Sequence, residues 1–238
     1  MKPDLSVAIP AHNEEKYITR CIESIYLSAS LAGYTVEVVV ALNRCTDQTQ
    51  NIAESLDARC VVNDTKCIAT VRNAAVRATS APAVVTLDAD SWMSSNTVAE
   101  VIKHISDSRY IGGGTATWPE RFSVGILFSV LSIVPYVIKR GVSAGMFWFL
   151  RKSFDEIGGF DESLVSLEDL DFACRLKAYG KSKGQRYGTI RRNGITTSCR
   201  KFDKFGDWYL FNNPRLVREL FTGSNQRAAD HFYYDDQR

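Results

Sequence analysis

The most constraining feature of this 238-residue chain is a continuous apolar run that ends in two acidic residues. The run is Ala83-Val84-Val85-Thr86-Leu87, and Asp88-Ala89-Asp90 follows it directly. A strand of this composition is usually covered on both faces, as in a parallel α/β sheet. In such sheets ligands bind beyond the carboxyl ends of the strands, where these two carboxylates would lie. The sequence therefore predicts an α/β fold with acidic groups at its binding edge.

The remainder of the first half alternates strands with amphipathic helices. The patterns predict strands over residues 5–10, 36–42 and 60–62, each followed by a helix, over about 14–29, 46–56 and 68–79. Pro10 is predicted to end the first strand. Asn13 is predicted to cap the first helix, with Glu14 and Glu15 in its first turn. Successive β-α units of this kind imply a parallel sheet with right-handed crossovers.

After Asp90 the pattern is less regular. It predicts a helix over 96–106, a strand with a tight turn over 111–115, a strand over 146–150, a short helix over 152–157, a turn over 158–161 and a helix over 168–179. The run Gly112-Gly113-Gly114 is also compatible with a phosphate loop, but no Gly-Lys-Ser/Thr sequence follows it, so a strand is preferred. We expect these elements to complete one α/β domain.

Composition and charge narrow the class of protein. Apolar residues make up 45% and charged residues 24%, as in ordinary soluble domains. The net charge of +2, with no basic block, gives no reason to expect nucleic acid as a partner. Six scattered cysteines without a Cys-x-x-Cys pair favour reduced thiols over a zinc site or a disulfide framework. The first residues lack the apolar stretch of a signal peptide, so we expect a cytoplasmic location. A position at the inner face of the membrane is compatible with this expectation.

Residues 122–138 form a segment of 17 residues without a charge. Gly125, Ser129, Ser132 and Tyr136 recur at helical spacing, so a helix here has one small or polar face and one face of large apolar residues. One interpretation is a buried helix or a homodimer contact. Another is an interfacial helix that lies on a membrane or cradles a lipid-linked substrate, because Arg121, Lys139 and Arg140 flank it. The segment is also at the lower length limit for a membrane span. A span is the least favoured interpretation, because it would divide the domain in two.

The acid pair has two interpretations from its residues alone. Two carboxylates at a strand end repel each other unless a cation lies between them, and Mg²⁺ favours one or two carboxylates together with substrate phosphates. An isolated Asp-x-Asp sequence is also typical of a solvated turn.

Four motifs in order resemble the family 2 glycosyltransferases, which have the GT-A fold. They are Pro10-Ala11-His12-Asn13-Glu14-Glu15, Asn43-Arg44-Cys45-Thr46-Asp47-Gln48-Thr49, Asp88-Ala89-Asp90, and Gly158-Gly159-Phe160-Asp161 followed by Glu168-Asp169. The resemblance covers residues 5 to about 180. It implies a Rossmann-like, mostly parallel sheet flanked by helices, in a single domain with a C-terminal acceptor-side extension. Residues 1–115 would form the nucleotide-sugar-binding half, and residues 116–238 the half that binds the acceptor and carries the catalytic base.

Carried over by position, the resemblance implies a set of donor contacts from Pro10, Ala11, Glu14, Asn43, Asp47, Arg72 and Asp88. Asp90, with Asp88, would hold a divalent metal, Mg²⁺ or Mn²⁺. Asn43 departs from the family, which usually has aspartate there to read the base, so the base of the UDP- or GDP-type donor stays open. Arg200 follows the hydroxyl run Thr196-Thr197-Ser198 and is predicted to close over the diphosphate. Arg191 and Arg192 are alternatives for that role, and His231 is a further candidate metal ligand.

The resemblance also implies the chemistry. Asp169 would be the general base that takes the proton of an acceptor hydroxyl in an inverting transfer, and Glu168 would raise its pKa. The acceptor would be a glycan or a lipid-linked or polyprenyl intermediate of cell envelope polysaccharide. Without the other motifs, Glu168 and Asp169 are equally typical of acids at a helix N-terminus. Two other functions stay open: a non-catalytic nucleotide- or carbohydrate-binding protein, and a sugar-phosphate nucleotidylyltransferase.

Overall fold

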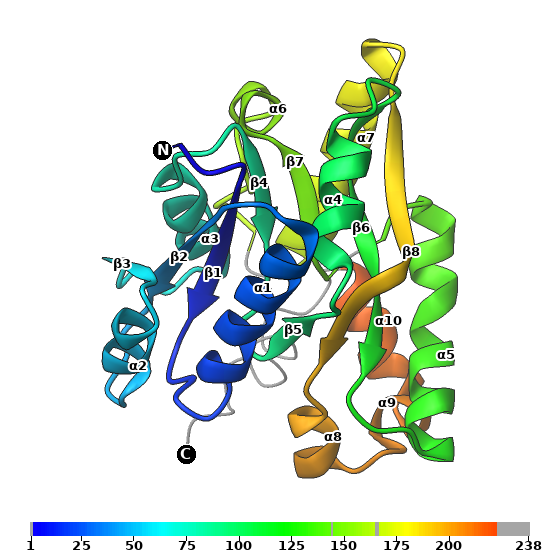
Figure 1. The fold of residues 1–238 in the computed structure, drawn as a ribbon. Coiled ribbons are helices and arrows are strands. Elements are labelled where there is room, and N and C mark those ends of the chain that lie inside the picture. Colours follow the sequence, from blue (N-terminus) through cyan, green and yellow to red (C-terminus); the bar gives the residue numbers. More distant parts are fainter. Residues whose placement is uncertain (1, 144, 165–166, 223–238) are drawn as a thin grey trace.

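The computed structural model describes residues 2–143, 145–164 and 167–222 (Figure 1). Their fold is one eight-stranded sheet in the order β3-β2-β1-β4-β7-β6-β8-β5, with helices on both faces. The strands are β1 (Leu5–Ala11), β2 (Val36–Leu42), β3 (Arg59–Val62), β4 (Ala83–Thr86), β5 (Ser91–Met93), β6 (Tyr110–Pro119), β7 (Phe147–Leu150) and β8 (Arg186–Thr197). The helices are α1 (Ile18–Ala32), α2 (Thr49–Ser55), α3 (Ile68–Arg77), α4 (Thr97–Ile105), α5 (Val124–Arg140), α6 (Arg151–Glu156), α7 (Glu168–Ser182), α8 (Arg200–Phe205), α9 (Tyr209–Asn212) and α10 (Pro214–Thr222).

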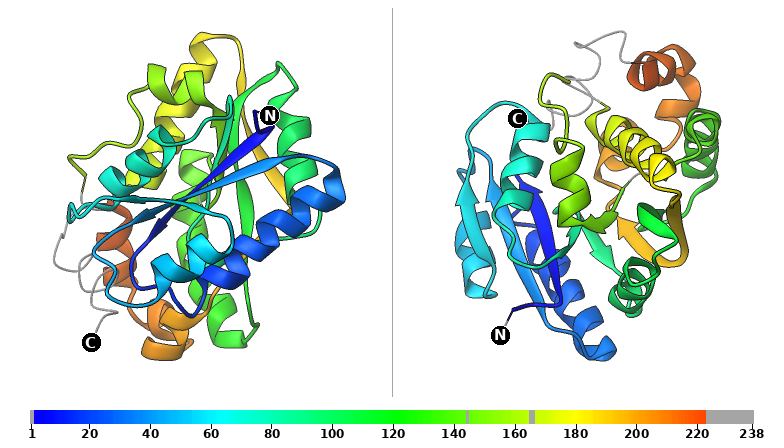
Figure 2. Two further views of the ribbon diagram at one scale, coloured as in Figure 1. Left: turned by 60° about the vertical axis from the view of Figure 1, so that its left-hand side comes forward. Right: turned by 90° about the horizontal axis from the view of Figure 1, so that it is seen from above.

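Helices cover both faces of the sheet, as the view from above in Figure 2 shows. Apolar residues of α1, α2 and α4 pack on one face and those of α3, α6 and α7 on the other. Strands β1 to β4 pair in parallel, which confirms the β-α units predicted from the sequence. Beyond β4 the sheet is mixed, because β7 runs antiparallel to both β4 and β6, and β5 runs antiparallel to β8. The predicted boundary between residues 115 and 116 falls inside β6.

The predictions for the first loop were wrong in two details. Strand β1 continues through Pro10 to Ala11. Proline is tolerated there because pairing between β1 and β4 ends at Ala8, so a missing N–H on that side breaks no ladder bond. Asn13 does not cap a helix: its φ is +52°, its Oδ1 accepts a hydrogen bond from the Thr46 amide at 2.8 Å, and α1 begins only at Ile18.

The second half differs from the sequence prediction mainly in its strands. β5 and β8 were not predicted, and the segment around Gly113 is part of a ten-residue strand rather than a strand with a tight turn. Glycine is required at this point by close packing, since a Cβ on Gly113 would lie 2.1 Å from the Gly188 carbonyl oxygen and 2.5 Å from Trp148. The predicted helices at 96–106, 152–157 and 168–179 are confirmed as α4, α6 and α7.

This close packing leads to a stability prediction. Gly113→Ala should lower the free energy of unfolding by about 3 kcal/mol, because the backbone of β8 and the Trp148 ring must both shift to admit a methyl group. Gly184→Ala is the control: its φ is +71°, but nothing lies within 4 Å of its Cβ position. It should cost about 1 kcal/mol through backbone conformation alone. Denaturant unfolding measures both, and equal losses would contradict the packing explanation.

Helix α5 contains most of the uncharged segment 122–138, and its small face is turned inward. Gly125 and Ser129 are buried, and a Cβ on Gly125 would lie 2.9 Å from Trp208. The Ser129 hydroxyl donates to the Asp207 carbonyl at 2.7 Å. Large apolar residues on the other side of α5, including Leu127 and Leu131, are exposed. Within the described parts of the chain, none of the helices has both the length and the hydropathy needed to span a bilayer.

Candidate active site

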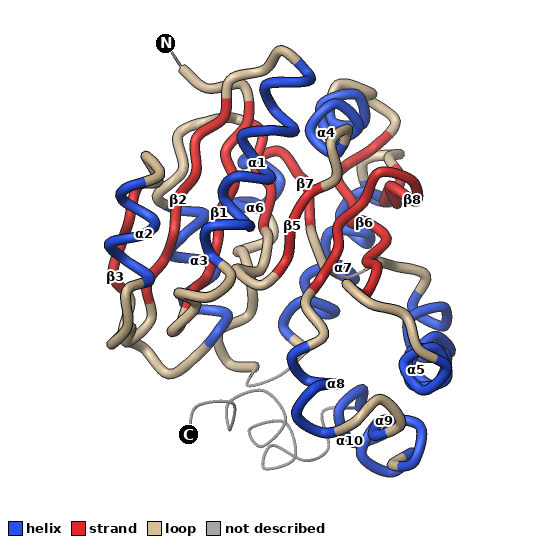
Figure 3. The backbone as a smooth tube through the Cα atoms, turned by 60° about the horizontal axis from the view of Figure 1, so that its bottom comes forward, coloured by secondary structure: helices blue, strands red, loops and turns tan. Residues whose placement is uncertain are grey.

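The residues predicted to form the site meet at the carboxyl ends of β1, β2 and β4. Glu14 follows β1, Asn43 follows β2, and Asp88 and Asp90 follow β4. These strands are parallel neighbours, so their ends lie along one edge of the sheet, which is turned forward in Figure 3. Leu87 continues the pairing by donating its amide to the Ala8 carbonyl, and the chain turns at Asp88.

Arg72 lies between Asp88 and Glu168, the first of the two acids at the start of α7. Its Nη2 lies 2.8 Å from Asp88 Oδ1, and its Nε lies 3.5 Å from Glu168 Oε1. The Arg72 and Glu168 side chains are both 9% exposed, whereas that of Asp88 is 40% exposed. Arg72 Nη1 is buried without a hydrogen-bond partner among the described residues. An unsatisfied buried donor is costly, so this guanidinium is well suited to bind an anionic group.

Arg200 makes the equivalent connection between Asp90 and Glu14. Its Nη1 lies 2.8 Å from Glu14 Oε2, and its Nε lies 3.1 Å from Asp90 Oδ2. The hydroxyl of Ser198 donates to the same Asp90 oxygen at 2.9 Å, and the Ser198 amide donates to the Asp90 carbonyl. Of the three arginines considered from the sequence, Arg200 is the one placed on Asp90, while Arg191 and Arg192 lie exposed within β8. His231 lies outside the described residues.

Three carboxyl groups of the site have raised pKa values. Burial is the main reason that the pKa of Glu14 rises to about 7; Asp90 acts in the same direction, and Arg200 opposes it. Burial also raises the pKa of both Glu168 and Asp169, and Arg72 opposes the rise in each. The Glu168 pKa is raised further by the adjacent Asp169 charge. Groups with raised pKa values in a cleft with opposite charges are typical of catalytic acid–base residues.

Asn43 and Asp47 hold the loops around the site through hydrogen bonds inside the chain. The Asn43 side-chain amide donates to the carbonyls of Asn63 at 2.6 Å and Thr65 at 2.9 Å. Asp47 accepts from the Thr49 amide at 3.0 Å and from the Glu15 amide at 3.0 Å. Pro10 and Ala11 line the buried end of β1, beside these loops. Donor contacts by these four residues stay predictions.

Sequence reasoning missed how firmly Asn73 holds the Gly158–Asp161 turn. Asn73 is fully buried; its Nδ2 donates to the Phe160 carbonyl and to Glu162 Oε1, both at 2.8 Å, and its Oδ1 accepts from the Phe160 amide. Gly159, with φ of +72°, passes so close that a Cβ would lie 2.7 Å from Asn73 Oδ1. The available signal was the adjacent pair Arg72-Asn73, whose members face the acids and the turn respectively.

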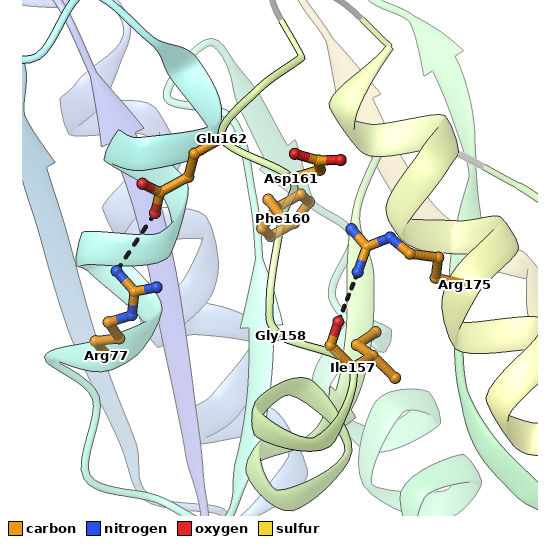
Figure 4. A pocket seen from close by; sticks show the side chains of 7 residues that line it. All are labelled: Arg77, Ile157, Gly158, Phe160, Asp161, Glu162 and Arg175. Carbon is orange, nitrogen blue, oxygen red and sulfur yellow. Dashed lines mark hydrogen bonds and ion pairs between the residues drawn. The ribbon is translucent and has the colours of Figure 1, made fainter.

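A cavity of about 430 Å³ lies on the other side of this turn (Figure 4). Its lining comprises Arg77, Ile157, Gly158, Phe160, Asp161, Glu162 and Arg175. The two arginines are engaged within the chain, Arg77 with Glu162 at 3.4 Å and Arg175 with the Ile157 carbonyl at 2.8 Å. The lining includes neither Asp88 nor Asp90, so we do not include this cavity in the candidate active site.

The acids after β4 fit a divalent cation that takes most of its ligands from a substrate. In the described part of the chain, no three His, Cys, Asp or Glu side chains are grouped to hold a metal ion. Mg²⁺ does not need such a cage, because it commonly uses one or two carboxylates with phosphates and water. Asp90 Oδ2 receives Ser198 and Arg200, while Oδ1 has a 3.5 Å contact with the Ser91 hydroxyl and retains lone pairs. Asp90, with Asp88 two residues away, therefore offers the kind of ligands that such an ion takes from a protein.

Comparison with known proteins agrees with this geometry. Residues 6–158, more than half of the chain, match the family described as Glycosyl transferase family 2. The chain belongs to this family. It is similar to chondroitin synthase of Escherichia coli, with 25% identity over 213 residues. The match covers 84% of this chain and 31% of that protein.

Solved structures of glycosyltransferases share the fold. S. aureus TarS 1–349 in complex with UDP-GlcNAc superposes with a TM-score of 0.63 at 20% identity, covering 83% of this chain and 58% of that one. The mannosyltransferase PcManGT from Pyrobaculum calidifontis, in complex with GDP-Man and Mn²⁺, gives a TM-score of 0.67 at 17% identity, covering 98% of this chain and 71% of that one. The fold is therefore the predicted GT-A fold. The chain spans about a third of the curated relative and less than two thirds of TarS 1–349.

Proposed function

We propose that this chain transfers a sugar from a UDP- or GDP-type nucleotide-sugar to an acceptor hydroxyl, with a divalent metal and with inversion at the anomeric carbon. The observation that carries the proposal is the arrangement of two acid–arginine pairs at the end of β4. Arg72 contacts both Asp88 and Glu168 of α7, and Arg200 contacts both Asp90 and Glu14. Family membership and the metal and nucleotide-sugars bound by the structural neighbours support it.

Each group has a task in this proposal. When bound, a divalent cation at Asp88 and Asp90 neutralises the negative charge that develops on the departing diphosphate. Arg72 and Arg200 already contact those two acids and add fixed positive charge beside them.

Asp169 would accept the proton of the attacking hydroxyl. It is half-buried, whereas Glu168 is buried and lies against Arg72, so Asp169 is the more accessible of the two. Its raised pKa brings its basicity closer to neutral pH than that of an ordinary aspartate. The acceptor would be a glycan or a lipid-linked intermediate.

The hydrogen bonds of the Asn43 side chain predict which nucleotide bases the site prefers. Both N–H groups of its amide are committed to the carbonyls of Asn63 and Thr65. Its Oδ1 accepts a long hydrogen bond from Arg44 Nε at 3.4 Å and keeps a second lone pair, so it can act as an acceptor, as an aspartate would. Uracil and guanine offer a ring N–H to such an acceptor, whereas cytosine and adenine have a ring lone pair at that edge. We expect UDP or GDP to bind at least about tenfold more tightly than CDP and ADP. Calorimetry in Mn²⁺ measures this, and equal affinities would remove Asn43 from base recognition.

The proposed activity is tested by nucleotide release from a panel of UDP-, GDP- and dTDP-sugars, with and without candidate acceptors. Acceptor-dependent release of UDP or GDP is the expected result. Binding of nucleotide without release from any donor and acceptor pair would favour the non-catalytic alternative. Release of diphosphate from a nucleoside triphosphate and a sugar phosphate would identify a nucleotidylyltransferase, which the family match does not favour.

A further inference from the structure

A continuous apolar surface lies over α5 and α9. It consists of Val124, Leu127, Phe128, Leu131, Trp208 and Phe211, each more than a third exposed, and we call it the α5–α9 patch. Phe128 stacks on Trp208 with ring centroids 5.7 Å apart and meets Phe211 edge-on at 5.4 Å. Because contiguous exposed apolar surface is uncommon on soluble domains, such a patch usually marks an interaction site.

The folding of α5 explains why this surface faces outward. The small residues Gly125 and Ser129 make the inward contact with the segment around Asp207 and Trp208, so the large residues of the helix are left on the outside. Arg121 fixes the same segment from the other end, with Nη2 at 2.7 Å from Asp203 and 2.8 Å from Asp207. The patch is therefore a fixed feature of the folded domain.

The region around the patch has an excess of basic residues. Residues 121–140 and 200–222, which include α5 and α8 to α10, contain eight Lys or Arg and three Asp or Glu, a net charge of +5. The whole chain has a net charge of +2, so all its other residues together carry −3. Arg200 pairs with Glu14 and Asp90 from outside these ranges, and with those two acids included the region has a net charge of +3. Figure 3 shows these four helices grouped at one end of the molecule, away from β1 to β3. Apolar and aromatic side chains within a basic surrounding are the combination that anionic bilayer surfaces attract.

We propose that the α5–α9 patch docks the protein on the surface of an anionic lipid bilayer. Trp208 and Phe128 would enter the headgroup region, where aromatic rings are favoured, and the basic residues would lie over the anionic headgroups. Arg121, just before α5, pairs with Asp203 of α8, and α8 begins at Arg200, which contacts Asp90, so α8 connects the patch region to the candidate active site. This inference rests on the proposed function for its consequence: the acceptor hydroxyl would belong to a lipid-linked molecule in the same bilayer.

Vesicle flotation tests the proposal. The wild-type chain should float with vesicles of equimolar phosphatidylcholine and phosphatidylglycerol at low salt, and only weakly with phosphatidylcholine alone or at high salt. Leu127→Glu with Leu131→Glu places two charges in the patch, at positions 49% exposed, and should reduce binding at least about tenfold. The matched control is Leu27→Glu with Leu31→Glu on α1, the same residue pair at the same spacing, 58% and 63% exposed, which should float like the wild type.

Two results would overturn the assignment. If the wild-type protein stays in the soluble fraction with both vesicle types, the patch does not bind a bilayer. A dimer in light scattering that the Leu127 and Leu131 substitutions dissociate would assign the patch to a second copy of the chain. UDP and GDP binding, measured on the same proteins, should be unaffected by either pair of substitutions. Wild-type protein that binds nucleotide but does not float with either vesicle type would leave the proposed function standing and remove only the docking surface.

Discussion

Asp90→Ala is expected to abolish metal-dependent nucleotide binding while the domain stays folded. Asp90 is 15% exposed at the end of a buried strand, and it is the acid best placed to hold a cation against the diphosphate. Since loss of even an outer-shell partner commonly costs about 10–100-fold in metal affinity, loss of this carboxylate should cost at least that much. Calorimetric titration of UDP and GDP in Mn²⁺, repeated with EDTA, measures the effect.

The titration with EDTA separates two roles of Asp90. If Asp90 holds the metal, the wild type loses affinity in EDTA and the variant is insensitive to it. If Asp90 acts only by orienting Arg200, the variant is weaker than the wild type by the same factor with and without metal. Asp155→Ala is the matched control, because it also removes a carboxylate paired with an arginine, Arg151, at 3.1 Å, but in α6. Unchanged affinity and metal dependence in Asp90→Ala would remove Asp90 from the metal site.

The first half of the fold was predictable because its signals are local. Each of β1, β2 and β4 is a buried apolar run, and each is followed by a polar residue that the parallel arrangement brings to one edge of the sheet. Asn43, Asp88 and Asp90 could be placed at that edge from the sequence alone. Their roles were indicated by the family resemblance rather than by the pattern.

The rest depends on contacts between distant segments. β8 has charged and exposed residues at several positions, among them Arg191 and Arg192, so it lacks the apolar run that revealed β4. Its pairing with β5 and β6 places Ser198 and Arg200 on Asp90, more than a hundred residues earlier in the chain. Asn13 was misread for the same reason: its hydrogen bond to Thr46 joins two loops, and local capping preference cannot anticipate it.

Asp169→Asn is expected to preserve nucleotide binding and to lower the rate of sugar transfer by about 10²–10⁴-fold. The amide keeps the shape of the carboxylate but cannot take the proton of the acceptor hydroxyl, and losing a general base typically costs this much. The wild-type rate should also fall as pH drops, because a base with a raised pKa becomes protonated at a higher pH than an ordinary aspartate. The variant should lack this acidic limb.

Two neighbours on α7 make the Asp169 experiment decisive. Asp171 lies in the same helical turn, but its carboxylate pairs with Arg175 at 2.6 Å and not with Arg72. The Asp171→Asn variant should therefore retain activity close to that of the wild type. Glu168→Gln should lose less than Asp169→Asn and should keep an acidic limb, because Asp169 would remain to accept the proton. Turnover of Asp169→Asn within about tenfold of the wild type would exclude it as the base. A large loss confined to Glu168→Gln would then transfer that role to Glu168, whose buried carboxyl contacts Arg72 at 3.5 Å.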